Sequence, residues 1–169
     1  MFITSYGLFW NRDEVMWHPG QGARKVFRLL GRDGVNAPNI SLADFTNQKG
    51  IYILYGNYGP YYVGITKKKG FGRRLKDHCM NQHSGNWDRF SWFGFCHVQK
   101  ATEADGIRKV KPDLALTKSG SPSQTITDTE ALLIRVMGLS NINTTKFKSA
   151  KEWIQIKVDE VEKYKAKVR

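Results

Sequence analysis

Two short runs of β-branched and aromatic residues, 51–55 and 61–65, lie only five residues apart in this chain of 169 residues. Each run has the composition of a β-strand. The sequence between them, Gly-Asn-Tyr-Gly-Pro at 56–60, has the composition of a tight turn. Because a connection this short joins antiparallel neighbours, the two runs predict a β-hairpin, and an antiparallel sheet is the starting point of the fold.

Signals for further strands and for helices follow on both sides of the hairpin. Strands are predicted at 6–10, 26–30 and 90–98, and a helix is predicted at 73–80. The polar stretch 100–126 predicts a long loop. Thr127 and Glu130 fit a capping box that opens a helix, with Gly138 as its stop. A similar pair, Ser149 and Glu152, predicts an amphipathic C-terminal helix.

These elements predict a mixed α/β (α+β) fold with a small antiparallel three-stranded sheet flanked by helices. We expect a β-rich extension at 1–45, a core domain at 46–145 with the loop 100–126 inside it, and the C-terminal helix at 146–169. The length suits one compact domain, because a chain of this size forms one substantial core.

The charge of the chain points to a polyanionic partner. Lysine and arginine number 27 and the acidic residues 15, so the net charge is +12. No apolar run approaches the roughly 18 residues of a membrane span, and the N-terminus lacks the layout of a secretory signal. Two cysteines, Cys79 and Cys96, are too few for a disulfide framework. We therefore expect a cytoplasmic protein with reduced thiols, a nucleic-acid partner and no membrane partner.

The positive charge is densest between positions 67 and 76, where no acidic residue occurs. The basic residues there are Lys67, Lys68, Lys69, Arg73, Arg74 and Lys76. Such a segment can bind a phosphodiester backbone without reading bases. The alternative is a solvated basic loop, and the charge of the whole chain favours the nucleic acid over it.

Three residues after the predicted hairpin carry groups suited to phosphate chemistry. Arg74 and His78 share a face if they lie on a helix; arginine presents a fork of donors to phosphate, and histidine exchanges a proton near neutral pH. Glu130 is either the capping residue or a ligand for Mg²⁺, which takes few protein carboxylates. The zinc-binding atoms of the chain, on Cys79, His83, Cys96 and His97, do not have the spacing of a zinc site.

The order of these parts resembles the GIY-YIG nuclease superfamily over about residues 48–145. The two signature motifs are Gly50-Ile51-Tyr52 and, nine residues later, Tyr62-Val63-Gly64. A segment with Arg74 and His78, a further strand, Glu130 and a late asparagine then follow in the family's order. Ile65 departs from the pattern, since several members carry lysine directly after the second motif's glycine.

The resemblance implies metal-dependent hydrolysis of phosphodiester bonds, usually in DNA, on one face of the small sheet. By motif, the catalytic residues are Tyr52, Tyr62, Arg74, His78, Glu130 and Asn143, with Asn141 as the alternative for the last. Tyr52 would help to deprotonate the attacking water, and Arg74 would neutralise charge on the phosphate. Glu130 would hold a single Mg²⁺ or Mn²⁺ ion.

The favoured function is a stand-alone DNA endonuclease that resembles the restriction-type members, with a role in restriction or phage defence. Two alternatives stay open at this point: a non-catalytic nucleic-acid-binding module that would need no metal, and a nuclease that acts on RNA. Residues alone leave both a monomer and a homodimer open.

Overall fold

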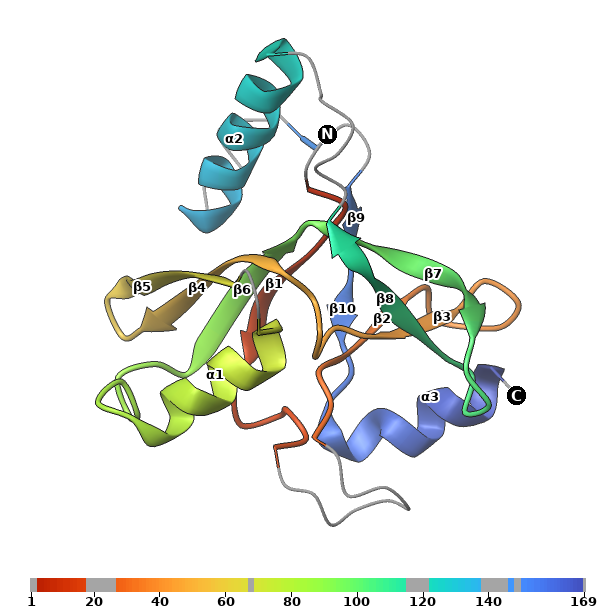
Figure 1. Ribbon diagram of the computed structural model, residues 1–169. Helices are drawn as coiled ribbons and strands as arrows, with labels where there is room; N and C mark the ends of the chain where they lie inside the picture. The colour runs from red at the N-terminus through yellow and green to blue at the C-terminus, as the bar shows by residue number, and fades with distance from the viewer. Residues whose placement is uncertain are drawn as a thin grey trace.

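The computed structural model describes residues 3–17, 27–66, 69–114, 122–137, 146–147 and 150–168. Within these residues, ten strands form two five-stranded sheets (Figure 1). The first has the order β5 (Gly59–Thr66), β4 (Gly50–Gly56), β6 (Arg89–Gly94), β1 (Ser5–Asn11), β9 (Lys151–Glu152). The second has the order β10 (Ile154–Gln155), β2 (Leu30–Asp33), β3 (Ser41–Asp44), β8 (Ile107–Leu114), β7 (Cys96–Thr102). The helices are α1 (Phe71–Met80), α2 (Pro122–Val136) and α3 (Val161–Val168), and a 3₁₀ turn at Val158–Glu160 precedes α3.

The predicted hairpin is formed by β4 and β5. The strands are antiparallel and close through Asn57 and Tyr58, with Gly56 opposite Gly59. β6 pairs antiparallel with the other side of β4, which gives the expected three strands. β1 and β9 extend this sheet, β1 pairing with β6 and β9 running parallel to β1. The mixed fold class is confirmed, and the strand expected at 6–10 is part of the same sheet as the hairpin.

The two faces of the first sheet are covered by different helices. Side chains alternate along a strand, so Tyr52 and Ile53 of β4 point to opposite faces. Tyr52 belongs to the core cluster that contains Phe71 of α1, and Ile53 to the cluster that contains Ala131 of α2. Figure 1 shows α1 and α2 on opposite sides of the sheet.

The two sheets share an aromatic core. Phe45, which follows β3, packs on Trp92 of β6 and on Trp153, with ring centroids 4.4 and 5.1 Å apart. The buried side chain of Gln48 donates from Nε2 to the carbonyl of Cys96 and accepts the backbone N–H of the same residue. α3 packs on the face of the second sheet that points away from this core.

The prediction of a long loop at 100–126 is wrong over the part that the structure describes. β7 runs to Thr102, β8 occupies Ile107–Leu114, and α2 begins at Pro122. β7 and β8 pair with register shifts on both sides of Val98, so their sequences lack the regular alternation that marks a strand. Because α2 begins before Thr127, that residue lies inside the helix, and the capping box at Thr127 is wrong as well.

The C-terminal helix is present but starts at Val161, later than expected. Residues 151–155 instead form β9 and β10, one in each sheet, with the buried Trp153 between them. The strand expected at 90–98 is divided in the same way, between β6 and β7. None of the described helices is long and apolar enough to cross a membrane.

Candidate active site

Tyr52 is fully buried on β4, and its ring lies across Gly64 on the neighbouring strand. The two residues are directly paired in the register of β4 and β5. A Cβ atom at position 64 would overlap the ring and the hydroxyl of Tyr52, so the site requires glycine there. The glycine of the second motif therefore makes room for the tyrosine of the first.

Tyr62 lies on the same face of the sheet as Tyr52. It precedes Gly64 by two residues on β5, and a spacing of two keeps side chains on one face. The two tyrosine rings are 6.2 Å apart between centroids. Tyr52 is buried and Tyr62 is half-buried, so Tyr62 forms the solvent-facing side of the pair.

Helix α1 brings Arg74 and His78 to the two tyrosines. The buried residues of α1 recur at the spacing of one helix face, and His78 is the last of them. Nε2 of His78 lies 2.7 Å from the hydroxyl oxygen of Tyr52, and its ring lies 5.0 Å from that of Tyr62. Arg74 is one turn earlier, and its charge acts on the Tyr52 hydroxyl. The structure thus brings four of the sequence-predicted residues together.

Asn81, a residue that the sequence reasoning missed, fixes the orientation of His78. Its Oδ1 accepts the backbone N–H of His83 at 2.9 Å, which leaves Nδ2 next to Nδ1 of His78 at 3.3 Å. Because an amide nitrogen only donates, Nδ1 is the acceptor and the ring proton is on Nε2. His78 therefore donates its Nε2–H to the hydroxyl oxygen of Tyr52.

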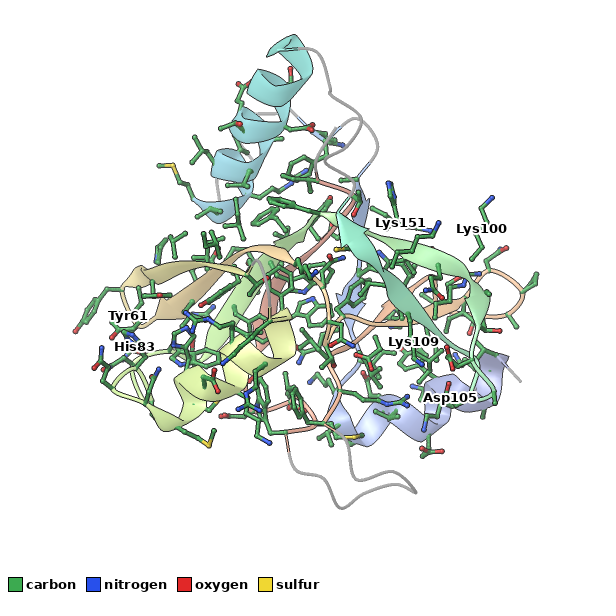
Figure 2. All side chains as sticks on the ribbon, in the orientation of Figure 1. Tyr61, His83, Lys100, Asp105, Lys109 and Lys151 are labelled. Atoms are coloured by element: carbon green, nitrogen blue, oxygen red, sulfur yellow. The ribbon has the colours of Figure 1, made fainter. Side chains whose placement is uncertain are left out.

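His83 also packs against the site, although the sequence suggests it only as a carrier of zinc-binding atoms. Its ring centroid lies 4.9 Å from Tyr62 and 5.1 Å from His78. Its Nδ1 is 3.0 Å from the hydroxyl of Tyr61, and Figure 2 shows the two side chains together at the end of the hairpin. The signal that could have found it is its place in the polar loop directly after the helix that carries Arg74 and His78.

Burial sets the charge states of the central pair. It raises the pKa of Tyr52 to about 12, an effect that Tyr62 strengthens and Arg74 opposes. Burial also lowers the pKa of His78; the charges of His83 and Arg74 lower it further, and the charge of Asp77 opposes them. At neutral pH the pair is therefore a neutral phenol beside a neutral imidazole.

The basic residues expected to bind phosphate have different surroundings. Within the described part of the chain, the guanidinium of Arg74 has no carboxylate partner. Arg73 is exposed and forms an ion pair with Asp77 at 3.4 Å. The ammonium of Lys76 lies 4.8 Å from the ring centroid of Phe27, and Lys69 is exposed. Lys67 and Lys68 lie outside the described residues.

Glu130 is not among the residues that meet at Tyr52. It lies on α2 with its side chain exposed, and α2 packs on the opposite face of the sheet through Ala131. Asn141 and Asn143 lie outside the described residues. Ile65, which stands where several members of the family have lysine, is 55% exposed and follows Gly64 on β5, so it points away from the face of the tyrosines.

The four assembled side chains can act on a phosphate ester. Arg74 offers a planar cation that matches phosphate geometry and has no carboxylate partner among the described residues. Tyr52 and His78 form a buried pair that can hold or move a proton beside it. Tyr62 completes the side that a substrate would approach.

Comparison with known proteins agrees with this chemistry. The family model of the GIY-YIG catalytic domain matches residues 48–135. This span includes the β4–β5 hairpin, α1, the strands β6, β7 and β8, and most of α2. No curated protein and no solved structure matches the chain.

Proposed function

Because the chain belongs to the GIY-YIG nuclease superfamily, we propose that it is an endonuclease that hydrolyses DNA phosphodiester bonds and requires a divalent metal ion. The observation that carries the proposal is the buried contact between Tyr52 and His78 beside Arg74, which has no carboxylate partner in the described part of the chain. The net charge of +12 supports a nucleic-acid substrate. A role in restriction or phage defence is part of the proposal and rests on the resemblance alone.

Arg74 binds the scissile phosphate in this proposal. Its fork of donors fits two phosphate oxygens, and no described carboxylate competes for it. Negative charge grows on these oxygens as the attacking oxygen approaches phosphorus. Arg74 therefore stabilises the transition state more than the bound substrate.

Tyr52 takes the proton of the attacking water in its phenolate form. The water oxygen bonds to phosphorus, the bond to the leaving oxygen breaks, and the leaving oxygen is protonated from solvent. The Nε2–H of His78 and the charge of Arg74 both favour the phenolate, while burial opposes it. His78 acts here as a donor that holds the Tyr52 oxygen, because Asn81 occupies its Nδ1 side.

The described residues around Tyr52 do not form a metal site. They supply phenol, imidazole and guanidinium groups, whereas Mg²⁺ prefers carboxylate, carbonyl and phosphate oxygens. No group of three or more His, Cys, Asp or Glu side chains in the described part of the chain is placed to hold a metal. Glu130 lies on the other face of the sheet. The requirement for Mg²⁺ or Mn²⁺ is proposed from the superfamily, whose nucleases are generally dependent on divalent metals, and no step above passes through the ion.

A plasmid cleavage assay with a matched pair of variants tests the function. Wild type is incubated with supercoiled DNA in Mg²⁺, in Mn²⁺ and in chelator, beside Arg74→Ala and Arg73→Ala. We expect cutting with metal only, a loss of roughly 100- to 1,000-fold in Arg74→Ala, and near wild-type cutting in Arg73→Ala, whose side chain is exposed and paired with Asp77.

Three outcomes would contradict the proposal. Equal activity of the two arginine variants would contradict the assignment of Arg74 to the scissile phosphate. Cleavage in chelator would contradict the metal requirement. Cleavage of an RNA transcript with no cleavage of DNA would replace the substrate class.

A further inference from the structure

A pocket of about 360 Å³ lies at the turn of the hairpin, next to the site but outside it. It is lined by Arg12, by hairpin residues 56–61 and by residues 85–88 of the loop between α1 and β6. Its volume falls in the roughly 300–1,000 Å³ range of small-molecule sites. A Cβ atom at Gly59 or Gly85 would meet no other atom within 4 Å, so both residues border open space.

The walls of the pocket carry exposed aromatic side chains and an amide that is not hydrogen-bonded to another described residue. Tyr58 is fully exposed at the tip of the hairpin, and Tyr61 is 43% exposed. Asn57 forms no hydrogen bond with another described residue, so its amide is available both to donate and to accept. An exposed aromatic ring beside a free amide is suited to a flat ligand with polar edges.

The charge of the pocket disfavours a phosphate as its ligand. Its one cation, Arg12, is hydrogen-bonded to Asp13 and to the carbonyl of Trp87, and stacks over the ring of Trp87 at 5.3 Å. Asp88, which also lines the pocket, adds a carboxylate. The two charges balance, so the pocket suits a neutral group.

Tyr61 connects the pocket to the site. It lines the pocket, and its hydroxyl is 3.0 Å from Nδ1 of His83, whose ring packs on Tyr62 and His78. Figure 2 shows Tyr61 and His83 side by side at this end of the sheet. A strand whose phosphate lies against Tyr62 is therefore close to the mouth of the pocket.

We propose that this pocket holds one unstacked nucleobase of the substrate strand, next to the phosphate that is cut, with Tyr58 stacked on the base and Asn57 on its polar edge. The inference rests on the proposed function for the identity of the strand. A base stacked on an aromatic side chain is bound with little dependence on sequence, because every base has a π-face. In a duplex the base must first leave the stack, which is easiest where pairing is weak.

The test measures binding in chelator, so that it does not depend on cleavage. Two fluorescein-labelled single strands of about 12 nucleotides, within the site sizes of known single-strand binders, are titrated with protein and followed by anisotropy. One strand has a mixed base sequence, and the other has the same backbone with every base replaced by an abasic analogue. The proteins are wild type, Tyr58→Ala, Tyr58→Trp and, as the exposed control in the connection between β2 and β3, Val35→Ala.

Wild type should bind the base-bearing strand at least tenfold more tightly than the abasic strand. Tyr58→Ala should lower that ratio about tenfold, the loss of one stacked base, while Tyr58→Trp and Val35→Ala should keep it. A ratio near one in wild type, or an unchanged ratio in Tyr58→Ala, would overturn the pocket assignment.

Plasmid cleavage by the same preparations separates this inference from the proposed function. DNA cleavage without a preference for the base-bearing strand would support the nuclease function and contradict the pocket assignment. A base preference that depends on Tyr58, without cleavage, would support the pocket assignment and contradict the proposed hydrolysis. Binding of neither strand would overturn the pocket.

Discussion

The hydroxyl oxygen of Tyr52 and Nε2 of His78 lie 2.7 Å apart, and both side chains are buried. The contact joins β4 of the first sheet to the last turn of α1, so the position of the helix determines the position of the tyrosine oxygen. The Asn81 amide on the far side of the imidazole gives the contact a direction, from nitrogen to oxygen.

The first prediction concerns pH. Burial raises the pKa of Tyr52 to about 12, so below that pH the phenolate fraction rises tenfold per pH unit. If this phenolate takes the proton, the logarithm of the cleavage rate should rise with a slope near one between about pH 7 and pH 9. Tyr52→Phe should be slow and should lose this slope. If the single-turnover cleavage rate of wild type does not change with pH, a group other than Tyr52 accepts the proton of the attacking water.

A second prediction concerns Asn81 as a positioning residue. Asn81→Ala removes the donor at Nδ1 of His78, so both tautomers should become populated. Cleavage should fall roughly tenfold, less than the ~100- to 10,000-fold that a proton-transfer group itself contributes. The ¹⁵N shifts of the His78 ring report the tautomer directly. Gln82→Ala, an exposed neighbour, serves as the control, and wild-type shifts in Asn81→Ala would contradict the assignment.

The third prediction concerns the space at Gly64. Gly64→Ala places a methyl group where the ring of Tyr52 lies, and overpacking of this kind costs about 1–3 kcal/mol of unfolding free energy. Because the cost arises from one contact, Tyr52→Ala should relieve it. Urea denaturation of the two single variants and the double variant should therefore give a double variant less destabilised than the sum. Simple additivity would show that the clash is absorbed elsewhere.

A fourth prediction separates stability from activity at Glu130. The side chain is exposed on α2, so Glu130→Ala should leave the unfolding free energy within about 0.5 kcal/mol of wild type. The family resemblance assigns this glutamate to the metal, and on that basis metal-dependent cleavage should be lost. Full cleavage by a stably folded Glu130→Ala would contradict the assignment of this glutamate to the reaction.

Local signals predicted the hairpin and α1, because each is specified by residues close together in the sequence. The turn at 56–60 determines the register that pairs Tyr52 with Gly64, and the spacing from Arg74 to His78 places both on one helix. The two short strands within residues 151–155 were missed for the opposite reason. β9 and β10 are two residues long, and their partners lie more than 100 residues away in the sequence.

The site was predicted only as far as its motifs extend. Tyr52, Tyr62, Arg74 and His78 meet as the motif order indicates, but Asn81 and His83 depend on how the loop after α1 folds back over the hairpin. Their backbone and side-chain contacts, such as the bond from the His83 N–H to Asn81 Oδ1, have no counterpart in the spacing of residue types.

The pairing of β1 with β6 has a consequence for anyone who wishes to excise the catalytic module. A fragment cut at the limits of the family match, residues 48 and 135, would lose β1 and β9 and leave β6 as an unprotected edge with its hydrogen-bonding groups bare. Bare edges of this kind template edge-to-edge aggregation. A soluble minimal nuclease should therefore retain the N-terminal strand, or replace it with a strand designed to cover that edge.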